Sequence, residues 1–186
     1  AMEMLRGQHP KKEILPGGIL YYHIDDPVLE SDTPLSDEEA EQALLFALRP
    51  DGLVNSGEEI YRAMDQNFEG KSQMIPVEIK KNGEISTARS KVASTEEFAV
   101  ITRYVEHEIR QCGEAIYAGN IAVNPYRSDI ETSCTYCPYG SVCGMDAKIP
   151  GYEYRQFASM KKEEVLDQMQ TELARNRGKE ERSDEM

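Results

Sequence analysis

The sequence predicts an α+β fold with few strands, one long helix and a cysteine-rich loop near the C-terminal end. Three observations support this prediction. A β-branched and aromatic run at 19–24 is bounded by turn residues, as buried strands are. Apolar residues recur at spacings of three and four between 98 and 116, as on one face of an amphipathic helix. Three cysteines fall within the segment 134–143, which also contains Pro and Gly.

The long helix has the clearest boundaries. Ser94 and Thr95 supply an N-cap, Glu97 completes a capping box, and Gly119-Asn120 is a usual stop. Capping and turn residues place the other elements: a helix tail at 1–7, a helix from Ser36 that ends before Pro50, a short helix at 56–67, a hairpin of 75–80 and 84–87 joined through Asn82-Gly83, and a helix at 161–173 followed by a polar tail from Arg175 that we expect to fray.

The composition excludes several classes of protein. A net charge of -13 does not fit a free-standing DNA-binding module, so any DNA contact must be local or made by a partner. No apolar run approaches the roughly 20 residues that span a bilayer, and no apolar stretch follows the N-terminal charges as in a signal peptide. We therefore expect a cytoplasmic protein without membrane contact, whose four cysteines bind metal or are simply buried rather than disulfide-bonded.

The cysteine spacing predicts a metal site. Cys134, Cys137 and Cys143 form a Cys-x2-Cys-x5-Cys pattern in a segment too rich in turn residues for a protein core. Thiolates suit iron–sulfur clusters and zinc, and both normally take four protein ligands in a structural site. The remaining cysteine, Cys112, lies on the apolar stripe of the long helix, where a cysteine is usually a small hydrophobic residue. We expect the fourth thiol to be absent from this chain; the alternative is a self-contained zinc-binding interaction module that uses all four cysteines.

These residues resemble a known family. The run from Asp129 to Cys143, with Tyr136-Cys137-Pro138-Tyr139 as its core, is similar to the C-terminal cluster motif of the AddB family, the B subunits of bacterial ATP-dependent helicase/deoxyribonucleases. The match extends to the strand region from Pro16 to Pro27, to Ala118–Tyr126 and to Tyr154-Arg155. It covers nearly all of residues 1–173.

The resemblance implies most of the functional expectations. The nuclease domain of that family belongs to the PD-(D/E)XK superfamily, with an α/β restriction-endonuclease-like fold. Cys134, Cys137 and Cys143 would ligate a [4Fe–4S] cluster together with a thiol far upstream of Ala1. The metal-binding acids, the catalytic lysine and the Gln-x3-Tyr motif would also precede Ala1, so we assign no catalytic residue here and expect no activity of the fragment alone.

The parent protein would carry out Mg²⁺-dependent DNA cleavage in double-strand-break repair, with DNA and a helicase–nuclease partner subunit as partners. On this basis we divide the chain into three parts: the C-terminal part of a nuclease-like domain with inserted helices and a hairpin (1–126), a cysteine-cluster segment (127–160), and a terminal helix with a frayed tail (161–186). A fragment separated from neighbouring strands is expected to expose apolar surface and to self-associate.

One alternative places a Mg²⁺ nuclease site within this chain. Glu78-Ile79-Lys80 fits the Glu-x-Lys half of such a motif, with Asp25 or Asp26 as the partner acid. Glu-x-Lys arises by chance in a chain this rich in charge, and we interpret these charges as those of an exposed edge strand. Tyr136 and Tyr139 suit stacking on bases, but we expect them to pack around the cluster.

Overall fold

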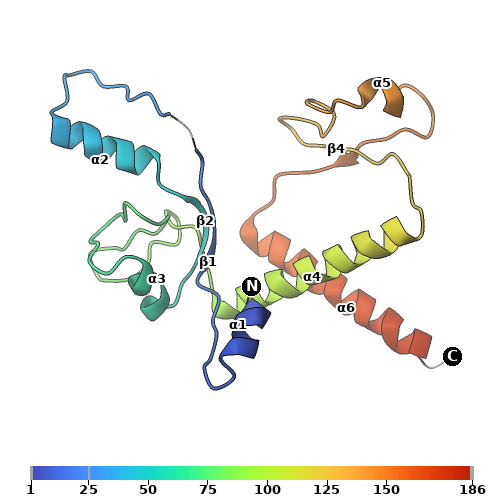
Figure 1. Cartoon of the computed structure of the whole chain (residues 1–186), viewed down its shortest axis with the longest axis horizontal. Helices are drawn as coiled ribbons and strands as arrows, with labels where there is room; N and C mark the ends of the chain where they lie inside the picture. The colour runs from blue at the N-terminus through green and yellow to red at the C-terminus, as the bar shows by residue number, and fades with distance from the viewer. Residues whose placement is uncertain (1, 25, 185–186) are drawn as a thin grey trace. The chain divides into compact units, whose positions relative to one another are not determined.

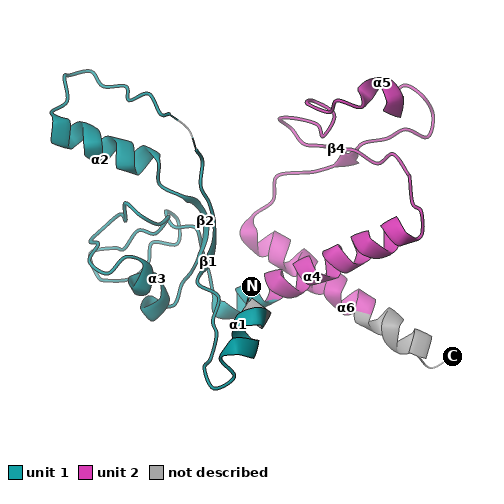
Figure 2. Cartoon of the chain, viewed as in Figure 1, with its two compact units in different colours: residues 1–99 teal, residues 100–186 magenta. Residues whose placement is uncertain are grey.

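The computed structural model describes residues 2–24 and 26–184, with side chains for 4–24 and 26–176. These residues form two compact units, 1–99 and 100–186, which are described separately (Figure 2). Helices and short strands are mixed in the α+β fold that the sequence predicts (Figure 1). None of the described helices is both long and apolar enough to span a bilayer.

A three-stranded sheet organises the first unit. Its strands are β1 (Gly18–Tyr21), β2 (Asp51–Asn55) and β3 (Val92–Ala93), in the order β1-β2-β3. β1 and β2 are antiparallel, with Gly18 opposite Val54, while β2 and β3 are parallel. The predicted strand at 19–24 therefore exists, but it is shorter than expected and lies at an edge with all four residues exposed, so its prediction as a buried, central strand is wrong. The central strand is β2, which sequence reasoning missed.

Asn55 fixes the centre of this unit. Its side chain is fully buried at the end of β2. Nδ2 donates to the carbonyl of Pro16 at 2.8 Å and to the hydroxyl of Thr95 at 3.0 Å, and Oδ1 accepts from the N–H of Gly57 at 2.9 Å. One buried amide thus joins the approach to β1, the start of the next helix and the start of the long helix, with its hydrogen-bonding groups satisfied.

The core of the first unit lies against β2 and β3. α3 (Glu58–Met64) contributes Tyr61, whose ring meets Phe68 edge to face at 6.2 Å. The buried members of this core are Val54, Tyr61, Phe68, Ile75, Val77, Ile79 and Val92. The predicted hairpin is present only as single bridges, which pair Lys71 with Glu78 and Ile79 with Ile85, because its apolar residues turn inward rather than forming a regular ladder.

The other helices of this unit follow their capping signals. α1 covers Met2–Gln8. α2 covers Asp37–Ala47 and has the predicted N-cap: the Ser36 hydroxyl accepts from the N–H of Glu39, whose carboxylate accepts from the N–H of Ser36 in return. None of the residues of α2 is buried, so local capping rather than packing defines this helix.

In the second unit two long helices pack together: α4 (Thr95–Tyr117), which begins in the first unit, and α6 (Lys162–Asp184) (Figure 1). The Tyr104 hydroxyl donates to the Glu172 carboxylate at 3.1 Å, and the His107 ring contacts the Asn176 amide at 2.8 Å. α6 extends beyond the predicted end at 173, so the expectation of a frayed tail from Arg175 is wrong as far as Asp184. The added residues are mostly Lys, Arg and Glu, which favour helix.

Candidate metal-binding loop

The three clustered cysteines lie in a loop whose ends are tied together. β4 (Tyr126–Arg127) and β5 (Arg155–Gln156) pair in parallel, so residues 128–154 leave and return at the same place (Figure 1). Tyr126 and Phe157 pack edge to face at 5.6 Å beside this pairing. The loop is therefore held by backbone hydrogen bonds and an aromatic contact at its base.

Short-range hydrogen bonds shape the backbone around each cysteine. The Cys134 N–H donates to the Thr132 hydroxyl at 3.2 Å, and the Cys137 N–H donates to the carbonyl of Cys134 at 3.3 Å, which makes a tight turn between these two thiols. Cys143 ends the one-turn helix α5 (Gly140–Cys143), which stops at Gly144 in a left-handed conformation with φ 66°. The Cys-x2-Cys-x5-Cys spacing thus corresponds to a turn followed by a helical turn.

The thiols have the right chemistry for an iron–sulfur or zinc site but are not gathered. Cys134 and Cys143 are half-buried, Cys137 is exposed, and all are free thiols. Over the described part of the chain, no group of three or more His, Cys, Asp or Glu residues is close enough together to hold a metal ion. The donor types fit a cluster, whereas the arrangement in this structure is an open loop that would have to close around one.

One neighbouring side chain already contacts a candidate ligand. The Tyr154 phenol donates a hydrogen bond to the Cys134 side chain, which together with burial raises the pKa of Tyr154 above its ordinary value. The Arg127 guanidinium lies 4.5 Å over the Tyr154 ring. Sequence reasoning included Tyr154 only as part of a resemblance, because its place beside Cys134 depends on the β4–β5 pairing, which no local pattern predicts.

The tyrosines within the cysteine motif point elsewhere. Tyr136 is 88% exposed and Tyr139 is 69% exposed. The structure therefore does not show the packing that we expected of them.

Cys112 is far along α4 and is also exposed, so it does not face a core as expected. The reason is that the apolar stripe of α4 is covered at one end only. Phe98 is 1% exposed, but Ile109 is 67% and Ile116 is 77% exposed. The latter half of the stripe, where Cys112 lies, has no covering element among the described residues.

The alternative nuclease residues are engaged in ion pairs. Glu78 accepts from Arg89 at 2.9 Å, and Lys80 lies 3.9 Å from Glu84. Glu78 is mostly buried, with its side chain 19% exposed, so the expectation of a fully exposed edge strand does not hold at this residue. Asp25 lies outside the described residues, and no metal-binding group that includes Asp26 or Glu78 forms among those that are described.

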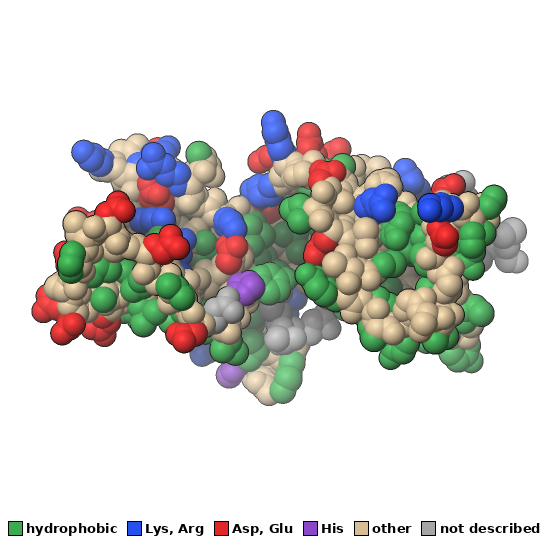
Figure 3. All heavy atoms as spheres, turned by 90° about the horizontal axis from the view of Figure 1, so that it is seen from above, with side chains coloured by type: hydrophobic (Ala, Val, Ile, Leu, Met, Phe, Trp, Pro, Cys, Tyr) green, Lys and Arg blue, Asp and Glu red, His purple; other side chains and the backbone are tan. Residues whose placement is uncertain are grey.

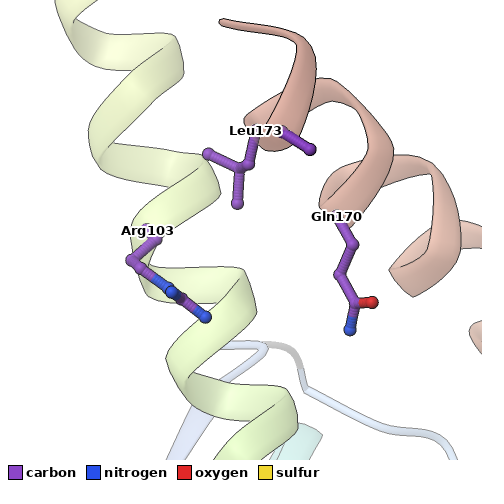
Figure 4. A pocket seen from close by; sticks show the side chains of 4 residues that line it. Arg103, Gln170 and Leu173 are labelled. Atoms are coloured by element: carbon purple, nitrogen blue, oxygen red, sulfur yellow. The ribbon is translucent and has the colours of Figure 1, made fainter. Parts of the chain in front are cut away.

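Two hollows were not predicted from the sequence. Between α4 and α6 a pocket of about 260 Å³ is lined by Arg103, Gln170, Leu173 and Ala174. Figure 4 shows Leu173 between the two helices, with Arg103 and Gln170 on opposite sides. A second, larger groove in the first unit is lined by several basic residues. Both are made by residues distant in the sequence, and only the adjacent pair Lys80-Lys81 carried a local signal.

Comparison with known proteins adds a different kind of support. Residues 1–144 match the model of the PD-(D/E)XK nuclease superfamily. The B subunits of the ATP-dependent helicase/deoxyribonucleases of Thermoanaerobacter sp. (strain X514) and Clostridium botulinum (strain Hall) are 38% identical over 161 residues and 39% identical over 158, covering 87% and 85% of this chain. The corresponding protein of Lachnoclostridium phytofermentans is 36% identical over 92% of the chain. The chain spans only about 14% of the length of these curated relatives.

Proposed function

Because the chain belongs to the PD-(D/E)XK nuclease superfamily and has the fold of that superfamily, we propose that it is the iron–sulfur-binding, C-terminal portion of a helicase–nuclease subunit that processes DNA ends in double-strand-break repair. The superfamily match covers 1–144, and the similarity to the B subunits continues through the cysteine loop. In this proposal the chain works in the cytoplasm, and DNA and a helicase–nuclease partner subunit are the partners of the whole protein.

The observation that carries the proposal is the tied loop with its three thiols. β4 and β5 bring the two ends of 128–154 together, and Cys134, Cys137 and Cys143 are the only cysteines within it. A cluster bound by a loop of this kind acts as a staple, because ligand bonds hold a segment that has little apolar core of its own. Residues 127–160 are thus the cluster-binding part, between a nuclease-like part (1–126) and a terminal helical part (161–186).

The ligand set that we propose is incomplete in this chain. A [4Fe–4S] cluster takes four cysteines, and the remaining one, Cys112, lies on the exposed face of α4. We propose that the fourth thiol is supplied by residues that this chain does not contain, so that the cluster is absent or labile here. By the same reasoning Mg²⁺-dependent cleavage belongs to the whole protein, and no residue of this chain is assigned to catalysis.

Anaerobic reconstitution with iron and sulfide tests the proposal. Each of Cys134→Ser, Cys137→Ser and Cys143→Ser should abolish whatever iron the chain retains, together with its visible absorption. Cys112→Ser is the matched control, since it removes one exposed thiol outside the loop. Iron binding that survives all three loop substitutions would overturn the proposed ligands.

The exposed apolar strand β1 supports a second property of the isolated chain. Ile19, Leu20, Tyr21 and Tyr22 are between 40% and 68% exposed, along a strand with one free edge. Such an edge is a template for pairing with another chain. We propose that the chain self-associates in isolation through this edge.

A further inference from the structure

The first unit contains an unassigned groove of about 560 Å³ with a basic lining. It lies between the end of α3 and the turn that follows Ile79. The lining residues are Arg62, Phe68, Glu69, Gly70, Ile79, Lys80, Lys81 and Gly83. Three cationic side chains therefore face one acidic side chain, in a chain whose net charge is -13.

Arg62 is held in position by its surroundings. Its Nη1 donates to the carbonyl of Phe68 at 3.1 Å and, more weakly, to that of Gln66 at 3.4 Å. The guanidinium also lies 5.1 Å over the ring of Phe68 and 5.7 Å over that of Tyr61. Since these contacts use one nitrogen and one face, the other N–H groups of this fixed cation are left to bind an anion, which costs little side-chain entropy.

The two lysines stand on the turn at the other side of the groove. The Lys80 N–H donates to the carbonyl of Glu84 at 2.8 Å, which closes the turn. The Lys80 ammonium lies 3.9 Å from the Glu84 carboxylate, but both side chains are more than half exposed, so this ion pair is weak and easily replaced. Lys81 has no acidic partner among the described side chains.

Two glycines leave the walls of the groove bare. Gly70 has φ 72° and Gly83 has φ 85°, a left-handed conformation that side chains rarely adopt. A Cβ at either position would meet no atom within 4 Å, so the space in front of both is open. The backbone there can be approached closely by a ligand.

Charge is also segregated over this unit. Figure 3 shows acidic side chains gathered at the lower left of the first unit and several basic ones along its upper edge. A local basic site on an acidic molecule attracts an anion while the remaining surface repels it, so binding is confined to that site.

From these observations we propose that the Arg62–Lys80–Lys81 groove binds a phosphodiester phosphate of a DNA strand. Its size suits one or two phosphate groups rather than a base-reading surface, and Lys and Arg are the usual contacts of such phosphates. The inference rests on the proposed function, since DNA is the substrate expected there. It adds a contact surface distant in sequence from the cysteine loop and not assigned by the family match.

Fluorescence anisotropy with a labelled oligothymidine, and with a duplex of the same length, tests the groove in the full chain. Lys80→Ala/Lys81→Ala should weaken binding about tenfold or more at low salt. The plot of log affinity against log salt should become shallower by about 1.4 for the single strand, because each lost phosphate contact contributes about 0.7. Lys11→Ala/Lys12→Ala is the matched control: two adjacent exposed lysines, the same change in charge, outside the groove.

The outcomes separate this inference from the proposed function. Equal losses in both double variants, or no loss in the Lys80/Lys81 variant, would overturn the groove as a DNA site. Absence of any DNA binding by the unaltered chain would do so too, while iron binding by the cysteine loop would still stand or fall by its own test. Displacement of the oligonucleotide by millimolar inorganic phosphate would assign the groove to a small free anion instead.

Discussion

Replacing Asn55 should destabilise the first unit more than any change on its surface. The side chain is 0% exposed, and truncation to alanine leaves the Pro16 carbonyl and the Gly57 N–H without their partners. A buried group left unpaired costs about 1–3 kcal/mol. The two groups together give about 2–6 kcal/mol, and water entering the space reduces this, so we expect a loss of about 3 kcal/mol.

The free energy of unfolding is measured by urea titration followed by far-ultraviolet circular dichroism, which suits a chain without tryptophan. Asn67→Ala is the control, since Asn67 is exposed and should change stability by less than about 0.5 kcal/mol. The slope with urea should stay the same in both variants. If Asn55→Ala unfolds within about 0.5 kcal/mol of the unaltered chain, the reasoning about the buried amide is refuted.

Two further predictions concern a glycine and a tyrosine. Gly52→Ala should cost about 1–3 kcal/mol or more in the same assay, because φ is +142° and a Cβ would overlap the backbone of β1, whereas Gly113→Ala, in open space on α4, should be neutral or stabilising by up to about 1 kcal/mol; equal effects would contradict this. Burial, aided by Glu108 and the hydrogen bond to Glu172, raises the pKa of Tyr104 to about 12. Since the folded pKa lies above the ordinary value, this stabilisation is full below pH 10 and is lost as pH rises toward 12; phenolate absorbance should show one late-ionising tyrosine that disappears in Tyr104→Phe, and an unchanged titration would refute the assignment.

Elements with strong local signals could be predicted from the sequence. The capping boxes at Ser36 and Ser94 fix the starts of α2 and α4, because both partners lie within one helical turn. Gly119 ends α4 as expected. The strand β2 was missed because Asp51–Asn55 has only two apolar residues, Leu53 and Val54, and its central place is set by partners about 35 residues away on each side.

The candidate site divides in the same way. The spacing of Cys134, Cys137 and Cys143 was readable, since the turn and helical turn that separate them are local. The contact between Tyr154 and Cys134 was not, because it depends on β4 pairing with β5 across the loop. Exposure was predicted least well, as β1 and Ile109 show: apolar patterning indicates a face that needs covering but not whether this chain covers it.

The most direct test of the central claim is the amount of iron and sulfide per chain after anaerobic reconstitution, in the unaltered protein and in Cys112→Ser. An incomplete set of three loop thiols predicts well under one [4Fe–4S] cluster per chain, labile to chelators and the same in both proteins. A stable, full complement of metal that is lost in Cys112→Ser would contradict the account, because the four cysteines of this chain would then form a complete site.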